Sequence, residues 1–552
     1  MQRPAHELIR EAIAANQIGQ PVAARVFRVT EATARESLAA SELREISRWL
    51  QDEPASLHAS IAGEQLTVLA RFHRGGSALV SIASTDSPAK ARHECIVWGQ
   101  LGTLHWVDGA AGGGVSSDRN AAPLADDDEL TNRIRTAIVG PSESSADELT
   151  LSAAPFPARE QPEQFAFAPC QPPYGVLLVA GDHTHQPGYA EAFLADGRAK
   201  LVAVADEADA SDRRHELNER FAKRLGIPYV RDLNQAISDP AVQIVCVCAE
   251  PMRRGRIIAA AARQGKHLYL DKPLAGSQSD ARLIADAART HRVASHMFSQ
   301  VNWSPAADAR EAVRSGRLGQ LSAIHCDLCF AKGIPGTADL AQARRESATP
   351  DCFELPDAKR ELTNVGVYCV TFLLWLMQRP VRRVWATTGN YFFAEHQHHD
   401  MEDFGQMLLE FDGGVTASVT AGRTGWQSHP GFGLNRIYMV GSQGQTVFDS
   451  SQSRLECWGH SSNWTPPARD PEDPMGMWMP LPDSPYRAAA KQAWRAAASM
   501  AWAEDVKHFL DRLQAGQPSE VPAELAAAAT HILFAAYRSA ATGQPVRLVG
   551  DE

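Results

Sequence analysis

The middle of the chain alternates short apolar runs with helical periodicity. Residues 175–180 form a continuous apolar run, which is typical of a strand buried on both faces. Strands that alternate with helices at this spacing form right-handed βαβ units. The pattern predicts a Rossmann-type doubly wound parallel sheet over residues 173–300. Its further strands are expected at 201–205, 242–248, 267–271 and 293–297, and its helices at 211–225, 253–264 and 279–290.

The segments on either side follow another pattern, in which alternating apolar and polar positions meet at glycine turns. Such runs predict hairpins in an open, largely antiparallel sheet, one face of which must be covered. We therefore expect an α/β domain over residues 301–552, for substrate binding and oligomerisation, and a second sheet over residues 1–109. The composition between them, over 110–172, favours a linker with one helix at 127–138.

The two sheet-forming segments resemble each other. Residues 10–20 run parallel to residues 310–320, and Leu69–Gly76 echoes Leu408–Gly414. Because the matches keep a common order, residues 1–109 are interpreted as a degenerate partial copy of the C-terminal domain. The copy lacks a counterpart of Gly366-Val367-Tyr368-Cys369, so we expect no catalysis from it.

The apolar sheet faces need a cover, since an open apolar face favours aggregation. We expect the N-terminal copy to pack against the sheet of residues 320–450, which would form an internal pseudo-dimer. The alternative is that the copy pairs with another chain in a homo-oligomer.

Composition narrows the choice of partners. The net charge of −11, without long runs of one sign, disfavours nucleic acid and an anionic membrane, and a small-molecule substrate is expected. No signal peptide and no run of roughly 18 apolar residues is apparent, which predicts a cytoplasmic protein. The nine cysteines form no CxxC pair, and His396-Gln397-His398-His399 is interpreted as a solvated loop, so no metal site is expected.

A cofactor crevice is expected at the carboxyl ends of the parallel strands. Asp206 ends the second strand, where an acid binds ribose hydroxyls, but the first turn keeps only Gly181 and Gly188 of a G-x-G-x-x-G run. Lys272-Pro273 ends another strand, so its lysine should point into the same crevice.

Two stretches in this region carry a family resemblance. Val245–Pro251 and the run from Gly265 through Asp271-Lys272-Pro273 to Ala275 resemble the signature of the glucose–fructose oxidoreductase/inositol dehydrogenase (Gfo/Idh/MocA) family. The resemblance implies an NAD(P)-dependent oxidoreductase. Asp206 favours NAD, although Arg213 and Arg214 keep NADP possible. The implied cofactor-binding residues are Gly181, Asp182, His183, His185, Asp206, Ala249, Glu250, Pro251, Asp271, Lys272 and Gln300.

A second motif implies the catalytic residues. Leu362–Thr371 resembles the family's helix entry, with Tyr368 at its histidine position and Asn364 and Thr371 at its two acidic positions. The resemblance implies Tyr368 as the acid/base, with Lys272 as the cation that favours its phenolate. Asn364 and Thr371 are expected to hydrogen-bond substrate hydroxyls, and Trp303 is a candidate wall for stacking a sugar ring. The alternative is packing in the core for Tyr368 and packing at the domain junction for Trp303.

The resulting hypothesis is an NAD(P)-dependent oxidoreductase that transfers hydride to or from a sugar, cyclic polyol or related hydroxy compound. The alternative is a catalytically impaired member of the family that acts as a ligand-binding or scaffold protein. It is motivated by the poor glycine turn and by Asn364 and Thr371, which cannot serve as acids.

Overall fold

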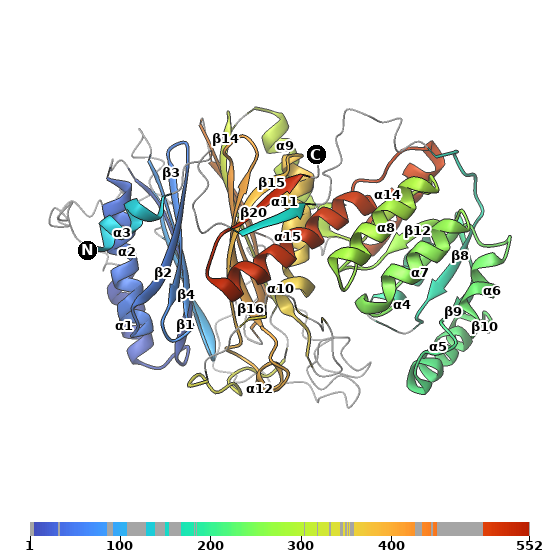
Figure 1. Ribbon diagram of the computed structural model, residues 1–552, viewed down its shortest axis with the longest axis horizontal. Coiled ribbons are helices and arrows are strands. Elements are labelled where there is room, and N and C mark those ends of the chain that lie inside the picture. Colours follow the sequence, from blue (N-terminus) through green and yellow to red (C-terminus); the bar gives the residue numbers. More distant parts are fainter. Residues whose placement is uncertain are drawn as a thin grey trace, which may run out of the picture.

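Three β-sheets stand in a row in the computed structural model, with residues 1–107 at one end and residues 174–297 at the other (Figure 1). The structure describes residues 5–30, 34–84, 92–107, 129–138, 149–153, 167–302, 304–424, 433–449 and 501–550, with gaps inside these ranges at 182, 184, 317, 331–332, 343–345, 348–349, 351–352, 354–357 and 443–444.

The parallel sheet has the strand order β10-β9-β8-β11-β12-β13, and all of its neighbouring strands are parallel. Side-chain oxygens of Ser211, Asp232 and Ser277 cap the helices that follow them, as expected for residues that satisfy free helix amides. The elements are β8 (Tyr174–Val179), α4 (Gln186–Asp196), β9 (Ala199–Ala205), α5 (Asp212–Leu225), β10 (Tyr229–Val230), α6 (Leu233–Ser238), β11 (Ile244–Val247), α7 (Pro251–Arg263), β12 (His267–Leu270), α8 (Gln278–Thr290) and β13 (Ser295–Met297).

The central sheet has eight strands in the order β19-β18-β14-β17-β16-β15-β20-β7 and is mostly antiparallel. Its elements are η3 (Gln300–Asn302), α9 (Ser304–Arg314), β14 (Leu321–Phe330), α10 (Glu361–Asn364), α11 (Gly366–Met377), β15 (Val381–Gly389), α12 (Ala394–His398), β16 (Phe404–Phe411), β17 (Thr416–Arg423), β18 (Gly433–Gly441), β19 (Gln445–Asp449), α14 (Ala501–Ala515), α15 (Ala523–Thr542) and β20 (Val546–Gly550). The expected α/β architecture, a doubly wound parallel sheet followed by an open, largely antiparallel one, is confirmed.

The N-terminal sheet has the order β2-β3-β4-β1-β5-β6, and six strands of the central sheet, β15-β16-β17-β14-β18-β19, follow the same plan. Each sheet contains one parallel pair, β1 with β4 and β14 with β17. Strands β1 and β14 also shift register against their antiparallel neighbours, β5 and β18, about two residues after they begin. The elements are α1 (Ala5–Ala14), β1 (Pro21–Thr30), α2 (Arg35–Leu50), β2 (Pro54–Ala62), β3 (Gln65–Phe72), β4 (Ser77–Ser84), β5 (Arg92–Gly99) and β6 (Gly102–Val107).

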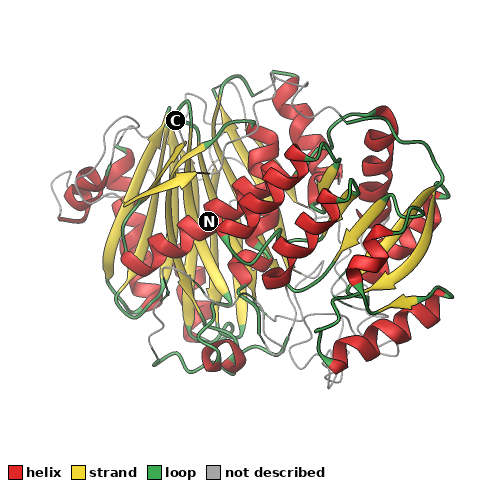
Figure 2. Ribbon diagram, turned by 45° about the vertical axis from the view of Figure 1, so that its right-hand side comes forward, coloured by secondary structure: helices red, strands yellow, loops and turns green. Residues whose placement is uncertain are grey.

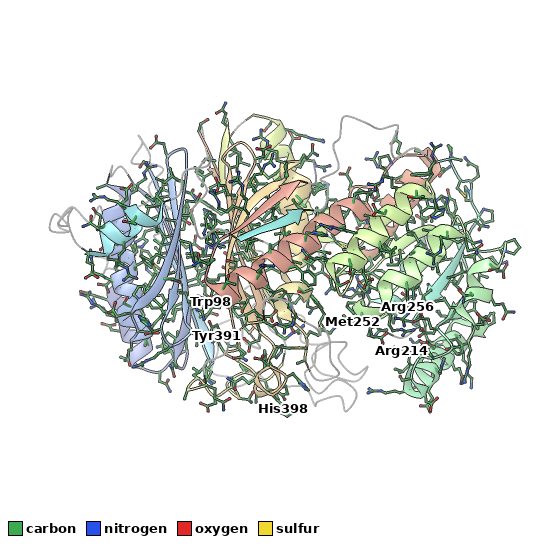
Figure 3. The ribbon with its side chains drawn as sticks, viewed as in Figure 1. Trp98, Arg214, Met252, Arg256, Tyr391 and His398 are labelled. Carbon is green, nitrogen blue, oxygen red and sulfur yellow. The ribbon has the colours of Figure 1, made fainter. Side chains whose placement is uncertain are left out.

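The N-terminal and central sheets pack face to face, while α1 and α2 cover the outer face of the N-terminal sheet (Figures 1 and 2). Trp98 and Tyr391 lie between the two sheets (Figure 3) and belong to one apolar cluster across the interface. Further clusters join Phe27 to Tyr438 and Leu79 to Trp385. Alternate residues of β1 and β5 therefore face the central sheet, as period-2 strands require.

A charged network crosses the middle of this interface. The Arg25 guanidinium pairs with Asp327 and donates a hydrogen bond of 2.8 Å to Ser418 Oγ. Asp327 also pairs with Arg436 at 2.9 Å, and Arg436 pairs in turn with Glu94 of β5. All four charged side chains are buried, so the network holds the sheets in one register.

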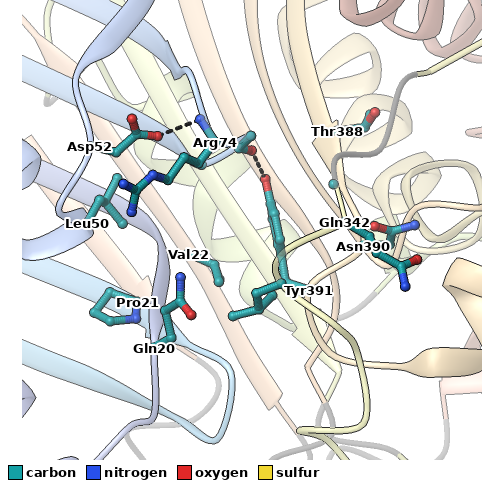
Figure 4. Close-up of a pocket in the computed structure, with 14 residues that line it drawn as sticks. Gln20, Pro21, Val22, Leu50, Asp52, Arg74, Gln342, Thr388, Asn390 and Tyr391 are labelled. Carbon is teal, nitrogen blue, oxygen red and sulfur yellow. Dashed lines mark hydrogen bonds between the residues drawn. The ribbon is translucent and has the colours of Figure 1, made fainter.

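A small polar pocket remains at one edge of the interface (Figure 4). Asp52 accepts a hydrogen bond from the Arg74 amide, and the Tyr391 hydroxyl donates to the Gly75 carbonyl across the two sheets. The first bond lies within the N-terminal unit, and the bond from Tyr391 joins the two sheets there.

Two expectations differ from the structure. The segment 110–172 contains α3 (Glu129–Ala137) and also β7 (Leu149–Ala153), which extends the central sheet beside β20. The linker prediction missed this strand because its partner follows it by almost 400 residues. The interpretation of His396–His399 as a solvated loop was wrong, since Ala394–His398 is the short helix α12 and the His396 side chain is buried. The histidines therefore do not point alternately as on an extended segment.

The last two helices tie the central sheet to the parallel sheet. Helix α15 packs against β15 of the central sheet and α8, and α14 packs against α4 (Figure 1). Among the described residues, no helix is long and apolar enough to cross a membrane.

Replacing Arg25 by Met should lower the free energy of unfolding by about 3–5 kcal/mol, because Asp327 would keep only part of its buried charge compensation. The measurement is urea-induced unfolding of the full chain. Arg48→Met is the control, since Arg48 is 60% exposed and its pair with Glu45 should contribute about 1 kcal/mol or less. Equal midpoints for the two variants would contradict a structural role of the network.

Candidate functional site

The turn after β12 is fixed by one buried arginine. Lys272–Pro273 is a cis peptide, and Arg254 of α7, only 1% exposed, reaches both sides of it. Arg254 donates to the carbonyl of Ala249 at 2.6 Å, to the carbonyl of Asp271 at 2.7 Å, and to Asp271 Oδ2 at 3.2 Å. Arg254 therefore fastens the lysine turn to α7.

Asp271 is fully buried and has three polar neighbours. Its Oδ1 lies 2.8 Å from His185 Nδ1 and accepts a hydrogen bond of 2.8 Å from the Tyr189 hydroxyl. Burial opposes its ionisation, but His185, Arg254 and Lys272 hold its pKa well below the usual range. Asp271 is therefore a fixed negative charge beside Lys272.

Lys272 is buried, and its amine has well-defined partners. Nζ donates to Asn364 O at 2.9 Å and to Asn364 Oδ1 at 2.7 Å. Burial lowers the pKa of Lys272 to about 7, with Asp271 opposing and Lys359 adding to the effect. An amine with this pKa exchanges protons near neutral pH.

Asn364 is oriented by a charged pair behind it. Its Nδ2 donates to Glu361 Oε2 at 3.0 Å, which turns its Oδ1 toward Lys272. Glu361 Oε1 accepts from Arg423 Nε at 2.9 Å, and His396 Nε2 lies 3.6 Å away. Burial opposes the charge on Glu361, but Arg423 and His396 hold its pKa far below normal.

Tyr368 lies beside Lys272 in an unexpected orientation. Lys272 Nζ is 5.1 Å from the centroid of the Tyr368 ring, so the ammonium faces the ring. Burial, with Asp271 and Asp505, raises the pKa of Tyr368 well above its ordinary value. Tyr368 is therefore held as the neutral phenol. The sequence, in contrast, predicts that the Lys272 cation favours the phenolate.

Tyr368 and Gln300 line one cavity, together with Asp327, Phe372 and Arg436. Thr371 is fully buried one turn further along α11, and its Oγ1 has no hydrogen-bond partner in the described part of the chain. Trp303 lies outside the described residues.

The carboxyl ends of β8, β9 and β11 form the expected crevice, at the point where the sheet order reverses. Gly181 has a φ of +28°, and a Cβ there would lie 2.3 Å from Asn218 Oδ1, so glycine is required. Asp206, at the end of β9, accepts from Asn218 Nδ2 at 2.8 Å and pairs with Arg253. Asp182, in the same turn, lies outside the described residues.

Ion pairs join the two sides of the crevice. Glu250, the N-cap of α7 ahead of Pro251, pairs with Arg214 at 3.1 Å and with Arg253 at 2.8 Å. His183 Nδ1 lies 2.9 Å from Arg214 Nη2. Ala249 is buried at the end of β11, next to the Cys248 amide that bonds back to β8. Arg214 reaches the turn through His183 and, like Arg253, is paired with Glu250 (Figure 3 labels Arg214).

The structure thus brings His185, Asp271, Lys272, Asn364 and Tyr368 together, while Asp206 and Glu250 belong to the other half of the crevice. Sequence reasoning missed Arg253, Arg254, Glu361, Arg423 and the role of His396. Arg254 offered one signal, a charge on the otherwise apolar face of α7.

A parallel sheet of this order, with an acid after its second strand, is the arrangement of a dinucleotide-binding fold. Residues 179–298 match the model of the oxidoreductase family with the NAD-binding Rossmann fold, and residues 306–447 match that of the GFO/IDH/MocA C-terminal domain. The chain belongs to the Gfo/Idh/MocA family, as its motifs predicted.

Individual relatives agree with this assignment. The chain is 27% identical over 253 residues to scyllo-inositol 2-dehydrogenase (NAD(+)) of Bacillus subtilis, a match that covers 45% of this chain and 65% of that protein. The structure of GenD2 from gentamicin A biosynthesis in complex with NAD has a similar fold, with a TM-score of 0.52 and 22% identity over 70% of this chain and 99% of that chain. WlbA dehydrogenase of Bordetella pertussis, in complex with NADH and UDP-GlcNAcA, has a TM-score of 0.50 and 17% identity over 68% and 98% of the two chains.

The crevice residues fit the expected NAD. Asn218 Oδ1 is buried beside Gly181 without a hydrogen-bond partner among the described residues, and the Asp206 carboxylate lies next to it. These acceptors suit the hydroxyl donors of an adenosine ribose, and Arg214 and Arg253 suit the phosphates.

Replacing Asp206 by Ala should raise the Kd for NADH about tenfold or more, because hydrogen bonds to a charged group contribute about 1.5–3 kcal/mol. The affinity for NADPH should fall less, since the carboxylate repels a 2′-phosphate. Fluorescence titration with both nucleotides measures the two constants. Glu219→Ala, at an exposed site on α5, is the control and should leave both unchanged; an unaltered NADH affinity in Asp206→Ala would exclude the ribose contact.

Proposed function

We propose that the protein is an NAD-dependent oxidoreductase that transfers hydride between the cofactor and a C–OH group of a sugar or cyclic polyol. The family assignment supports the class of reaction, and the names of the relatives, among them scyllo-inositol and myo-inositol dehydrogenases, support the class of substrate. The alternative of an impaired scaffold protein has no support from these comparisons.

The observation that carries the proposal is the hydrogen bonding of Lys272. A neutral amine has two N–H donors and one lone pair. Both donors are occupied by Asn364 O and Asn364 Oδ1, so the lone pair is the free position of Nζ. With a pKa near 7, the neutral form is well populated at physiological pH.

In the proposed oxidation, Lys272 Nζ takes the proton of the substrate hydroxyl as general base. Bound NAD⁺ supplies the acceptor for the hydride that leaves the same carbon, so a ketone, NADH and a lysine ammonium result. Asp271 stabilises the ammonium, and the two Asn364 oxygens keep Nζ in place during the transfer. In reduction, the ammonium returns the proton to the carbonyl oxygen.

Tyr368 is proposed as a neutral hydrogen-bond donor to the substrate oxygen instead of the proton carrier. Its raised pKa keeps the proton on the phenol, and its ring lies against the Lys272 amine. The cavity that it lines with Gln300 offers polar groups for further hydroxyls. Thr371 and Trp303 stay as expected substrate contacts.

We also propose that residues 1–109 are a degenerate copy of the C-terminal domain and serve as an internal partner for it. The common strand order supports the copy, as do the left-handed glutamines Gln51 and Gln378 that end α2 and α11. The face-to-face packing supports the internal pseudo-dimer. A cytoplasmic location is part of the proposal, because buried free thiols such as Cys246 and Cys248 suit a reducing compartment.

Replacing Asn364 by Asp should move the pH dependence of substrate oxidation upward. The wild-type rate should rise with pH through a midpoint near 7, as Lys272 loses its proton. A carboxylate at the Asn364 position favours the ammonium, so the midpoint should rise by about 1–3 pH units. The measurement is kcat against pH in the oxidation direction.

Two controls accompany this test. Lys272→Met should abolish turnover while NADH binding persists, which separates chemistry from cofactor binding. Tyr368→Phe should lower kcat but leave the midpoint in place. A midpoint that moves in Tyr368→Phe and not in Asn364→Asp would assign the titration to the tyrosine.

The internal pseudo-dimer predicts that the full chain is a monomer of 60.0 kDa in solution. The reason is that the central sheet face is already covered by the N-terminal sheet. Size-exclusion chromatography with light scattering measures the mass. A stable particle of twice that mass would favour pairing between chains.

A further inference from the structure

Three potential metal ligands meet on the outer side of the N-terminal sheet, away from the crevice and from the central sheet. His6 belongs to α1, Glu42 to α2 and His93 to β5, and one ligand atom of each lies within 4.8 Å of the other two. Residues 1–107 lie outside both regions that match the family models, so the family accounts for nothing at this cluster.

The ligand atoms are close enough together for one ion. His6 Nε2 lies 3.4 Å from Glu42 Oε2, and His93 Nε2 lies 3.4 Å from Glu42 Oε1. Zinc binds nitrogen and carboxylate oxygen at about 2.0–2.1 Å, so ligand atoms around it lie about 3.3–3.4 Å apart, and each imidazole lies at this distance from one of the two carboxylate oxygens. These contacts are also longer than ordinary charge-assisted hydrogen bonds.

One carboxylate oxygen is left available. Arg28 Nη1 donates to Glu42 Oε1 at 2.9 Å and fixes the carboxylate, whereas Glu42 Oε2 is buried without a hydrogen-bond partner among the described residues. A buried, unpartnered carboxylate oxygen is costly unless a donor or an ion reaches it. His6 is 21% exposed, so an ion can enter on its side.

The imidazoles are held in place by aromatic neighbours. The ring centroids of His6 and Trp49 are 5.5 Å apart, and those of His93 and Trp106 are 5.3 Å apart with the rings edge to face. Rotamers locked in this way lower the entropic cost of binding an ion.

A candidate fourth ligand lies beside His93. Cys95 Sγ lies 3.4 Å from His93 Nε2, and the two side chains share one face of β5. Cys95 does not belong to the three residues whose ligand atoms all lie within 4.8 Å of one another, so its thiol would have to move toward the ion to complete a tetrahedral set.

We propose that His6, Glu42 and His93 bind a divalent transition-metal ion of the zinc type, with Cys95 as the candidate for a fourth ligand. The ion joins α1 and α2 to β5, and so fastens the helical layer of the N-terminal unit to its sheet. Arg28 acts behind the site by orienting Glu42.

The test uses the full chain, stripped with a chelator and titrated with Zn²⁺ against a chromophoric competitor. The wild type should bind one tight equivalent, and His93→Ala and His6→Ala should each lose affinity by at least about 100-fold. His6→Ala is the safer variant for folding, because His6 lies on the partly exposed side of the cluster. His73→Ala, in the exposed turn after β3, is the matched control and should bind as the wild type does.

Zinc can also bind outside the site, at the exposed His398 and its neighbour His399, so every protein tested, including the wild-type reference, carries Ala at these two positions. Zinc should raise the Tm of the wild type and of His73→Ala, but not that of His6→Ala. A wild type without a tight equivalent, or wild-type affinity in both His6→Ala and His93→Ala, overturns the site and leaves a polar cluster of Glu42 with Arg28. Cobalt tests the fourth ligand: a thiolate charge-transfer band present in the wild type and lost in Cys95→Ser assigns Cys95, and its absence from the wild type excludes it.

Discussion

The burial of the Lys272 amine is the constraint on which the site depends. An ammonium removed from water is costly, and within the described part of the chain no carboxylate accepts a hydrogen bond from this one; its hydrogen bonds there go to the two oxygens of Asn364. The protein therefore lowers the pKa to about 7 and lets the amine exist without its charge. The other charges, Asp271 with Arg254 and Glu361 with Arg423, are paired with each other, which leaves Lys272 as the group that titrates.

The N-terminal sheet packs on both of its faces because side chains along its strands point alternately to one face and the other. Strand β1 presents Arg25, Phe27 and Val29 to the central sheet, while the residues between them face α1 and α2. Each strand of the N-terminal unit therefore serves two interfaces. The inner one closes the central sheet, and the outer one contains the cluster of His6, Glu42 and His93.

Much of the fold was accessible from the sequence because it depends on local periodicity. Buried parallel strands are continuous apolar runs, and helices end at glycines such as Gly226 and Gly265, so the βαβ units could be placed within a few residues. Asp206 and Lys272 could be assigned to the crevice because strand ends meet at one edge of a parallel sheet. Strand β7 could not be found, since its partner β20 follows it by almost 400 residues.

The sequence by itself determined the family, the order of the sheets and the strand-end residues of the crevice. Only the tertiary structure decided what those residues can do: that Arg254 fastens the cis turn, that Lys272 faces the ring of Tyr368, and that Arg423 and His396 come to Glu361 from distant segments. It also brought His6, Glu42 and His93 together from three elements. The physical reason is that a pKa, a hydrogen bond and a coordination shell depend on distances of a few ångströms between side chains, and periodicity along the chain does not encode those distances.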